Sequence, residues 1–486
     1  MLRLPSRIHL EWPLGKCAVV PVILAIVAIA GCTVGPKYTR PSAEVPPAFK
    51  EAGPDWKVAE PSDAIAKGKW WEIYGDPQLN SLEEQVSVSN ESLKAEEEQF
   101  AQAREAIRIS RSQYYPQITA GALGAHYSES PNRPLNLSLP SYQDYQIPVQ
   151  ASWEPDLWGR VRRTVEASRS EAQATAADLA NVDLSLHAEL AQDYFELRGL
   201  DAQKKLLDST VDTYQRALDL TESRYNGGVA SAVDVAQAQT QLETTRAQDQ
   251  DVDVARAAYE HAIAVLTGKP PYELTVPPLP LTTPPPVTPV SAPSQLLERR
   301  PDIAAAERRM QEANARIGVA ETAYYPTISL SASGGFESGS AGTLLQGDSG
   351  FWSLAGSAAE LIFDGGQRRG LTEQARAAYR QSVDNYRQTT LTAFQEVEDN
   401  LAALRVLQTE TGTEEAAVAT AQHSLDLSIT RYKGGVANYL EVTTAQSAAL
   451  SDEITALNIL SRQFSASILL VKALGGGWDV SKIPAM

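Results

Sequence analysis

One seven-residue stretch occurs twice in this chain and constrains its fold more than any other feature. Arg224–Ala230 reads Arg-Tyr-Asn-Gly-Gly-Val-Ala, and Arg431–Ala437 repeats it with lysine in place of asparagine. Each copy separates two long segments with helical apolar spacing, so each predicts a tight turn between two helices. Paired glycines suit such a turn, because glycine adopts positive φ without a Cβ clash. The duplication predicts a chain built from two similar halves.

Two further landmarks keep nearly the same spacing. Tyr114–Ile118 reads Tyr-Tyr-Pro-Gln-Ile, and Tyr324–Ile328 reads Tyr-Tyr-Pro-Thr-Ile, 210 positions later. Asp156 and Asp364 lie 208 positions apart, and the glycine turns lie 207 apart. Proline after each tyrosine pair stops a preceding helix. Three landmarks in one register therefore support an internal repeat.

Each half is predicted as a helix, a β-hairpin, a very long helix, a turn and a helix. The long helix from Leu157 to about Arg224 would measure about 100 Å at 1.5 Å per residue. Such a helix suits packing against other long helices rather than a globular core. The predicted parts are a first repeat at 70–269 with its β-hairpin at about 117–153, a connector at 270–293 with ten prolines, a second repeat at 294–475 with its β-hairpin at about 327–363, and a tail at 476–486.

The predicted strands have one apolar and one polar face. Apolar residues at Tyr145, Ile147, Val149 and Trp153 alternate with polar ones. Outer-membrane strands have this pattern over about ten residues, and no run of about 18 apolar residues follows the leader that could form a spanning helix. One chain offers four strands, whereas closed barrels begin at about eight and lipid tolerates no open edge. Spanning strands would therefore need several chains, and the alternative is a small soluble sheet.

The amino terminus resembles a lipoprotein signal. Basic residues precede an apolar run at 17–30, which is typical of a secretory signal peptide at 1–31. Ile29-Ala30-Gly31-Cys32 resembles the bacterial lipobox, which implies that Cys32 carries the lipid, palmitate included, and becomes the mature terminus. Thr33 rather than aspartate follows, which by the same resemblance implies the outer membrane. Residues 32–69 are then a lipidated extended arm; the alternative is a simple leader with a chance cysteine.

Several classes of function have no support. A formal charge of −18 argues against nucleic acid, which Lys and Arg bind. The five histidines show no metal-binding spacing, and no phosphate-binding loop is present. Gly347–Gly350 resembles a serine-protease nucleophile motif, but it falls in a predicted loop without a nearby histidine. We therefore expect no enzyme, no metal and no cofactor.

The landmarks together resemble the outer membrane factors, the TolC/OprM-like channels, and most closely their NodT-type lipoprotein efflux subunits. The resemblance covers nearly all of the mature chain and is carried by the lipobox, both glycine turns and the stretches Trp70–Pro77, Trp153–Arg160 and Arg299–Ile303. It implies a mainly α-helical chain with membrane β-strands. Three chains would form a 12-stranded outer-membrane β-barrel, four strands per chain, continued by a long periplasmic α-helical barrel.

The same resemblance implies a function. The homotrimer would be the passive exit duct of a tripartite efflux system for drugs or other small molecules. Its partners would be a periplasmic membrane-fusion adaptor and an inner-membrane pump of the resistance-nodulation-division (RND) type. Two alternatives stay open: a TolC-like duct for type I protein secretion, and a lipid-anchored periplasmic helical scaffold without a pore.

The resemblance also places the sites at the periplasmic tip. Adaptor contact is expected at Arg224, Tyr225, Asn226, Gly227, Gly228, Val229, Ala230, Ser231, Arg431, Tyr432, Lys433, Gly434, Gly435, Val436, Ala437 and Asn438. The gate is expected at Tyr432 and Leu440, which match OprM-like gates. Thr444 and Ser447 occupy the places of an aspartate and an arginine in those proteins, so Asp234 and Glu441 are the candidate acids here.

Overall fold

The structure is a computed structural model that describes residues 33–42, 45–51, 69–128, 130, 141–288 and 298–486. The predicted signal peptide and Cys32 lie outside these residues. The chain divides into two compact units. Unit 1 contains the described parts of 1–40, 102–172 and 308–383, and unit 2 those of 41–101, 173–307 and 384–486.

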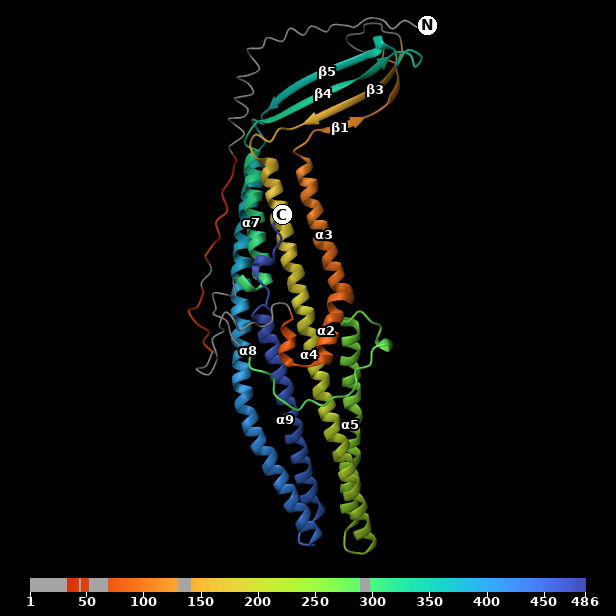
Figure 1. The fold of residues 1–486 in the computed structure, drawn as a ribbon, viewed down its shortest axis with the longest axis vertical. Helices are drawn as coiled ribbons and strands as arrows, with labels where there is room; N and C mark the ends of the chain where they lie inside the picture. The colour runs from red at the N-terminus through yellow and green to blue at the C-terminus, as the bar shows by residue number, and fades with distance from the viewer. Residues whose placement is uncertain (1–32, 43–44, 52–68, 129, 131–140, 289–297) are drawn as a thin grey trace. The chain divides into compact units, whose positions relative to one another are not determined.

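The helices come in pairs of equal length, one member in each half of the sequence (Figure 1). Two have 22 residues, two have 67 and two have 35. The pairs are α3 (Glu91–Ser112) and α7 (Pro301–Thr322), α4 (Arg160–Asn226) and α8 (Gln367–Lys433), and α5 (Ala232–Leu266) and α9 (Tyr439–Ala473). At 1.5 Å per residue, α4 and α8 are each about 100 Å long. The repeat read from the sequence is thus a repeat of whole elements.

An aspartate caps the start of each 67-residue helix. The carboxylate of Asp156 accepts hydrogen bonds from the backbone N–H groups of Val161 and Arg162, both at 2.9 Å. Asp364 accepts from the N–H groups of Gly366 at 2.9 Å and Arg368 at 3.0 Å. These bonds satisfy N–H groups that a helix leaves without internal partners. They explain why the two aspartates keep the repeat spacing.

The first half begins with an element that the sequence did not predict correctly. The sequence predicts one helix before the first β-hairpin, but α2 (Pro77–Ser89) ends at Asn90 and α3 begins after it. Asn90 has ψ 122°, donates from Nδ2 to the Leu266 carbonyl at 2.8 Å and accepts from the Leu93 N–H at 2.9 Å. Asparagine is well suited to cap a new helix in this way. The break was invisible because it depends on Leu266, far away in the sequence.

The strands form one antiparallel sheet in unit 1. Its order is β1-β3-β4-β5, and β2 also pairs with β3. The strands are β1 (Gln117–Ala120), β2 (Leu123–Tyr127), β3 (Tyr142–Trp153), β4 (Thr327–Ser338) and β5 (Gly350–Ala359). The described residues thus contain five strands rather than the four expected per chain, because the first is interrupted at 121–122. The last ends at Ala359 and not near 363.

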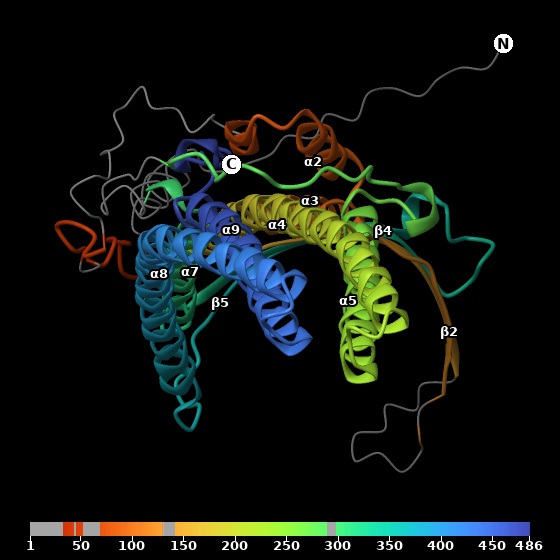
Figure 2. The ribbon, with the colours of Figure 1, turned by 90° about the horizontal axis from the view of Figure 1, so that it is seen from below.

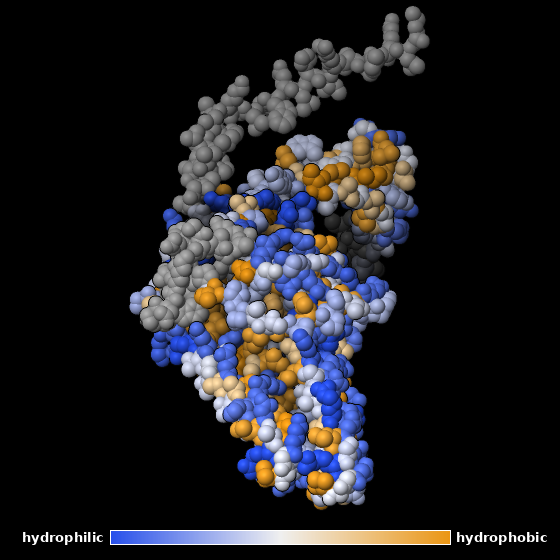
Figure 3. All heavy atoms as spheres, turned by 60° about the horizontal axis from the view of Figure 1, so that its bottom comes forward, coloured by the Kyte–Doolittle hydropathy of each residue, from blue (hydrophilic) through white to orange (hydrophobic). Residues whose placement is uncertain are grey.

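One face of this sheet is apolar and exposed. Val149 of β3 lies opposite Gly334 of β4, which lies opposite Trp352 of β5. Val149 is 49% exposed and Trp352 is 77% exposed, and Figure 3 shows apolar side chains gathered on the sheet. The other face is polar, as the hydrogen bond of 2.7 Å between Ser329 and Ser357 illustrates. Such a large exposed apolar face is suited to lipid or to a partner.

The core of unit 2 is rich in aromatic side chains. Phe195 of α4 stacks on Phe464 of α9 with ring centroids 4.2 Å apart, and Tyr74 lies against both. Tyr74 follows Trp70 and Trp71 in η1 (Trp70–Tyr74), whose indoles are buried in the same cluster. Trp70 and Trp71 therefore pack the start of the first repeat against α4 and α9.

Helix α9 is apolar enough to cross a membrane by length and composition, and is the one such helix among the described residues. The sequence reading had found no run of this kind after the leader. Ile468 and Val471 are buried in the aromatic core, and Leu470 is buried against Phe394 and Val397 of α8. The apolar composition of α9 is accounted for by this packing in unit 2.

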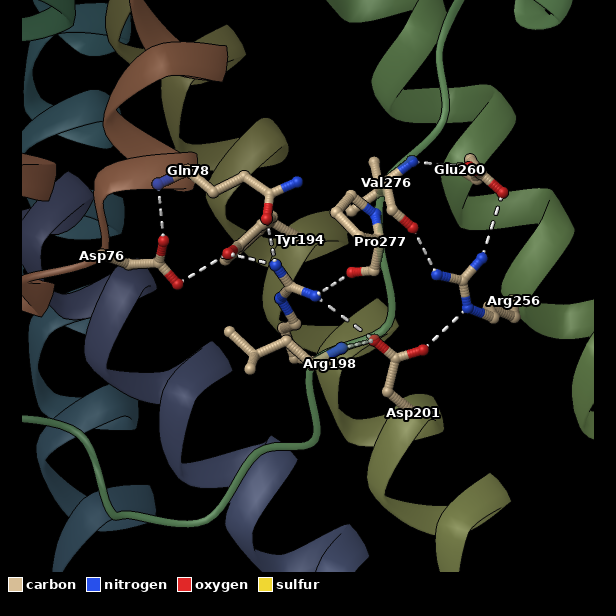
Figure 4. A network of polar contacts seen from close by, with 10 residues as sticks. Asp76, Gln78, Tyr194, Arg198, Asp201, Arg256, Glu260, Val276 and Pro277 are labelled. Carbon is tan, nitrogen blue, oxygen red and sulfur yellow. Dashed lines mark hydrogen bonds and ion pairs between the residues drawn. The ribbon is translucent and has the colours of Figure 1, made fainter. Parts of the chain in front are cut away.

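Two arginines, of which Arg198 is buried, bind the proline-rich connector to the helices of unit 2 (Figure 4). Arg198 of α4 donates to the Pro277 carbonyl at 2.7 Å, and Arg256 of α5 donates to the Val276 carbonyl at 2.6 Å. Both guanidinium groups also bind Asp201, at 3.3 Å and 2.7 Å. Arg198 donates further to Tyr194 and Gln78, so the network also reaches α2.

Candidate functional site: the two helical hairpin turns

The first turn ends α4 with a Schellman motif. The N–H of Val229 donates to the carbonyl of Arg224 at 2.8 Å, and the N–H of Gly228 donates to the carbonyl of Tyr225 at 2.9 Å. Gly228 has φ +74°, the left-handed conformation that this motif requires at its turning residue. The bonds satisfy carbonyl groups that the helix end would leave without partners.

The second turn has the same bonds, from Val436 to Arg431 and from Gly435 to Tyr432, at 3.1 Å and 3.0 Å. Gly435 has φ +73°. Among the described glycines of the two turns, positive φ is confined to Gly228 and Gly435. The expectation that both glycines of each pair adopt positive φ is therefore wrong for Gly227 and Gly434. Each turn needs one glycine for its backbone geometry.

The two turns differ in how the next helix starts. Ser231 and Asp234 form a capping box, with bonds of 3.2 Å and 2.8 Å between each side chain and the other's backbone N–H. In the second turn Asn438 accepts from the N–H of Glu441 at 3.2 Å. The Glu441 carboxylate instead lies 3.5 Å from Arg431 Nε. Asp234 is thus committed to its own helix, whereas Glu441 pairs across the turn.

The two hairpins meet through Arg224. Its guanidinium carbon lies 4.8 Å from the centroid of the Tyr432 ring, and Nη1 donates to the Lys433 carbonyl at 3.1 Å. Its Nε is buried without a hydrogen-bond partner among the described residues. A cation above an aromatic face is attracted by the ring, more strongly when water is excluded. Arg224 therefore links the end of α4 to the end of α8.

A buried tyrosine cluster lies behind this contact. Tyr432 is 6% exposed and packs edge-to-face on Tyr439, with ring centroids 5.1 Å apart. Tyr214 of α4 donates to the Gln446 carbonyl of α9 at 3.1 Å. Burial raises the pKa of Tyr439 to about 12, so its hydroxyl stays neutral. The equivalent of Tyr432 in the first turn, Tyr225, is 48% exposed.

The predicted gate residues do not gather at one point. Tyr432 is in the tyrosine cluster, Leu440 is 53% exposed, and Asp234 is in its capping box. Thr444 donates to the Leu440 carbonyl of its own helix at 2.8 Å. Ser447 donates to the Gln241 side chain at 3.3 Å and so joins α9 to α5. Thr444 and Ser447 thus have short polar side chains at the positions where OprM-like proteins have an aspartate and an arginine.

An apolar groove adjoins the first turn. It has a volume of about 470 Å³ and is lined by Ala232, Val233, Ala236, Gln237, Thr240, Gln241 and Thr443. Valines at the turns are also exposed, with Val229 at 68%, Val233 at 63% and Val436 at 71%. Small side chains allow a close approach by another helix, and exposed valines are suited to a protein contact.

Sequence reasoning missed two features of this molecule that bear on its function. Arg224 was expected to contact a partner, yet it bridges the two hairpins. In unit 1, Trp158 stacks on Tyr325 with ring centroids 5.0 Å apart and donates to the Pro326 carbonyl at 2.7 Å. Outer-membrane strands carry aromatic residues at both interfaces, and this group lies at the helix-proximal strand ends. The tyrosine pair that precedes proline in each half was the signal for it.

The donor sets that bind metal ions consist mainly of His, Cys, Asp and Glu side chains. Among the described residues, no three His, Cys, Asp or Glu side chains are placed to hold a metal ion. What the hairpins offer is a contact between two helix ends, held by a cation over a ring and by buried tyrosines.

Several known proteins are similar to this chain in both sequence and fold. The family model described as outer membrane efflux protein matches residues 82–269 and 292–476. The chain is 31% identical over 468 residues to the outer membrane protein OprJ of Pseudomonas aeruginosa, covering 95% of this chain and 96% of that protein. It is 32% identical over 460 residues to the toluene efflux pump outer membrane protein TtgF of Pseudomonas putida, covering 93% and 95%.

The solved structure of the CmeC outer membrane channel of Campylobacter jejuni has a TM-score of 0.84 at 25% identity, covering 93% of this chain and 96% of that one. The fold class expected from the sequence is confirmed, since the described chain is mainly helical, carries membrane-type strands and contains the matched domain twice. Repeated hairpins, an exposed apolar sheet and these matches establish that the chain belongs to the outer membrane efflux protein family.

Proposed function

We propose that this chain, an outer-membrane efflux channel of a Gram-negative bacterium, forms a homotrimeric exit duct that is closed at its hairpin turns. The duct passes drugs or other small molecules outward without chemistry of its own. Energy comes from an inner-membrane pump of the RND type, which a periplasmic membrane-fusion adaptor joins to the duct. The observation that carries the proposal is the match of two complete repeats to the efflux family.

The sheet supports the trimer. Within the described residues, no strand pairs with the outer edge of β5 or with the outer edges of β1 and β2. An unpaired edge in lipid leaves backbone groups without hydrogen bonds. Since β1 and β2 together occupy one strand position, each chain offers four positions, and three chains give a closed ring of 12. The exposed apolar face would then face lipid.

The hairpins support the closure and the adaptor contact. The Arg224 contacts with Tyr432 and Lys433 hold the two turns of one chain together, and the Tyr432–Tyr439 pair packs within the second hairpin. The exposed valines and the groove beside Ala232 remain available for adaptor helices. An adaptor that competes for these groups would separate the hairpins, which opens the duct. In this scheme Tyr432 closes the duct, whereas Leu440 and Glu441 face outward and serve contact.

Lipidation of Cys32 adds a second hold on the membrane. A lipobox cysteine carries several acyl chains, and each buried methylene contributes about 0.8 kcal/mol to membrane binding. The exposed apolar strands argue against a lipid-anchored periplasmic scaffold without a pore, because such a scaffold has no need of a sheet with a large apolar face. The name of the relative TtgF, a toluene efflux pump outer membrane protein, favours small molecules over the type I secretion of proteins.

Single-channel recording of the purified protein in planar bilayers tests this function. Wild-type protein should open rarely, and Tyr432→Ala should raise the open probability strongly, because it removes the ring beneath Arg224. Tyr225→Ala is the matched control, since it removes the equivalent but exposed tyrosine, and should behave like the wild type. Absence of conductance from wild type and Tyr432→Ala alike would exclude the duct. Equal effects of the two substitutions would exclude Tyr432 as the closure.

A further inference from the structure

One arginine of α4 binds the backbone of Val34, Gly35 and Pro36, near the start of the described chain. Arg163, in the first turn of α4, is 6% exposed. Its Nε donates to the Val34 carbonyl at 3.1 Å, and its Nη2 donates to the carbonyls of Gly35 and Pro36 at 3.1 Å and 3.0 Å. The N–H of Val34 donates to the Trp158 carbonyl at 3.1 Å. Three successive carbonyl groups are thus bound by one guanidinium.

Three glycines from distant parts of the sequence make room for this segment. A Cβ on Gly35 would lie 2.4 Å from the Gly318 Cα, and a Cβ on Gly159 would lie 2.8 Å from Thr33 Cγ2. A Cβ on Gly318 would lie 2.9 Å from Arg163 Nε. Gly35 and Gly159 also have φ values of +98° and +88°, which disfavour other residues. Backbone shape and space are therefore both adapted to the segment.

The charge of Arg163 is compensated inside this contact. Nη1 lies 2.9 Å from the Glu166 carboxylate one helical turn away. Asn314 of α7 donates to the Pro36 carbonyl at 3.1 Å, which adds a neutral hydrogen bond from another helix. A buried guanidinium is costly unless its donors are satisfied, and hydrogen bonds from a charged donor are stronger than neutral ones. The segment supplies three of the acceptors that make this burial favourable.

The second half of the chain has no equivalent seat. Gly370 occupies the place in α8 that Arg163 occupies in α4, 207 residues earlier. A Cβ at Gly370 would meet open space. The helix cap is repeated at Asp156 and Asp364, so the duplicated part is the helix start and not the peptide contact. Arg163 is thus specific to the half that follows the amino terminus.

We infer that this group is a binding site for the chain's own processed amino-terminal segment. We call it the amino-terminal seat and define it by Trp158, Gly159, Arg163, Asn314 and Gly318. Cys32 lies outside the described residues, but the covalent chain joins it directly to Thr33. The seat therefore binds the residues that directly follow Cys32 in the sequence. Its link to a membrane anchor rests on the proposed lipidation of Cys32, whereas the binding of Thr33–Pro36 does not.

Limited trypsin digestion of the detergent-extracted full-length protein tests the seat. Cleavage after Lys37 releases the amino-terminal peptide, and a protease needs a locally unfolded segment. Loss of charge-assisted bonds in Arg163→Ala should accelerate release about tenfold or more, and Arg163→Lys should lie between it and wild type. Arg369→Ala, which removes an exposed arginine from the first turn of α8, should match wild type. Mass spectrometry quantifies the peptide at early times.

Equal release from Arg163→Ala and wild type would overturn the seat. If Arg163→Ala does not assemble, Gly35→Ala carries the test, because it keeps the arginine and disturbs the segment itself. It should also release the peptide faster, and an unchanged rate would count against the proposal. The mass of the released peptide distinguishes a failure of the proposed lipidation of Cys32 from a failure of the amino-terminal seat. A peptide without acyl groups on Cys32 contradicts lipidation and leaves the seat standing.

Discussion

The two long helices α4 and α8 have the same length but receive different segments of the chain at equivalent positions. Arg163, His187 and Arg198 of α4 are buried polar residues, each in contact with a segment that occurs only once in the chain. The residues 207 positions later in α8 are Gly370, Phe394 and Arg405. Gly370 is exposed, Phe394 packs on Phe49, and the Arg405 side chain is 53% exposed.

This difference shows what duplication did and did not repeat. The lengths of the paired helices and the Schellman turns are the same in both halves, because each depends on residues within its own repeat. The amino-terminal segment, α2 and the connector occur once, so α4 and α8 could each adapt to a different covering segment. Arg163 and Arg198 of α4 are buried because the extended segments that cover this helix have backbone carbonyl groups that need hydrogen-bond donors. The equivalent residues of α8 are either apolar, as Phe394 is, or exposed, as Gly370 and Arg405 are.

Removing the buried arginine of the connector network should have the largest effect. Arg198→Ala deletes donors to Pro277, Gln78 and Tyr194 and leaves Asp201 buried with fewer partners. Breaking a buried charged network of this kind costs about 3–5 kcal/mol. We expect hydrogen exchange in the connector and in α2 to accelerate by that local free energy, while the sheet keeps its protection.

Arg405→Ala is the matched substitution in the second half. Arg405 pairs with Glu51 at 2.5 Å, but its side chain is largely exposed, so the expected loss is at most about 1 kcal/mol. Similar losses from the two arginines would break the comparison between α4 and α8. A much larger loss from Arg198→Ala would sharpen it.

The docking of α2 on α4 should weaken as pH rises. His187 stacks on Trp71 with ring centroids 4.3 Å apart, and its Nδ1 lies 2.6 Å from Glu83. Burial lowers the pKa of His187, but hydrogen bonds with Asp183 and Glu83 outweigh it and raise the pKa to about 9. Burial raises the pKa of Glu83 to about 7, against the bond with His187. Both groups bind protons more tightly in the folded state than in the unfolded one.

The sign follows from linkage. Stabilisation from Glu83 is complete below its ordinary pKa of 4.5 and is lost by about pH 7, and that from His187 is complete below 6.5 and is lost by about pH 9. Hydrogen exchange of α2, corrected for the intrinsic effect of pH, should show a loss on the order of 1–3 kcal/mol between pH 5 and pH 10.

The second half supplies the control for this pH effect, because Phe394 replaces His187 there. A Glu83→Leu and His187→Phe double variant copies that apolar arrangement and should remove the pH dependence from α2. Equal protection of α2 at both pH values in the wild type would contradict the assignment.

The turns should show the smallest difference between the halves. Alanine at Gly228 or Gly435 must adopt positive φ and should cost about 1–2 kcal/mol of local stability in either turn. Alanine at Gly227 or Gly434 should cost less, because those glycines lack positive φ. Hydrogen exchange at the ends of α4 and α8 measures the four values. Equal costs for both glycines of a pair would refute the single-glycine reading.

The same positions connect the turns to transport. Leucine at Gly228 or Gly435 should abolish drug efflux from intact cells while trimer and membrane insertion persist, because the turn is where we expect the adaptor. Antibiotic susceptibility measures efflux, and SDS-resistant trimers in the outer-membrane fraction measure assembly. Loss of the trimer itself would instead assign the glycines a purely structural role.

Much of the frame could be read from the sequence. The spacing of the glycine turns and tyrosine pairs predicted two repeats, and the end predicted for the first long helix, near Arg224, lies close to Asn226. Strand alternation identified the apolar face of β3. These predictions succeeded because the spacing of apolar residues and the positions of proline and glycine determine the backbone conformation over a few residues. The break at Asn90 and the split between β1 and β2 escaped, because each depends on residues far away in the sequence.

The site divides in the same way. The turn residues were recognised from their repeated letters and from the family resemblance, and the role proposed for Leu440, Asp234, Glu441 and Tyr432 came from that resemblance. Which tyrosine is buried could not be read from two copies of the same Arg-Tyr pair. Tyr225 and Tyr432 have equivalent neighbours in sequence and opposite exposure in the structure.

The sequence by itself determined the repeated helices, their caps and their turns, because those features rest on contacts within a few residues. Only the tertiary structure decided where the unique segments dock and which polar groups become buried. Arg163, His187 and Arg198 look like ordinary helix residues until Val34, Glu83 and Pro277 are brought against them. Burial depends on residues that lie more than 70 positions away for each of them, and local sequence carries no record of those partners.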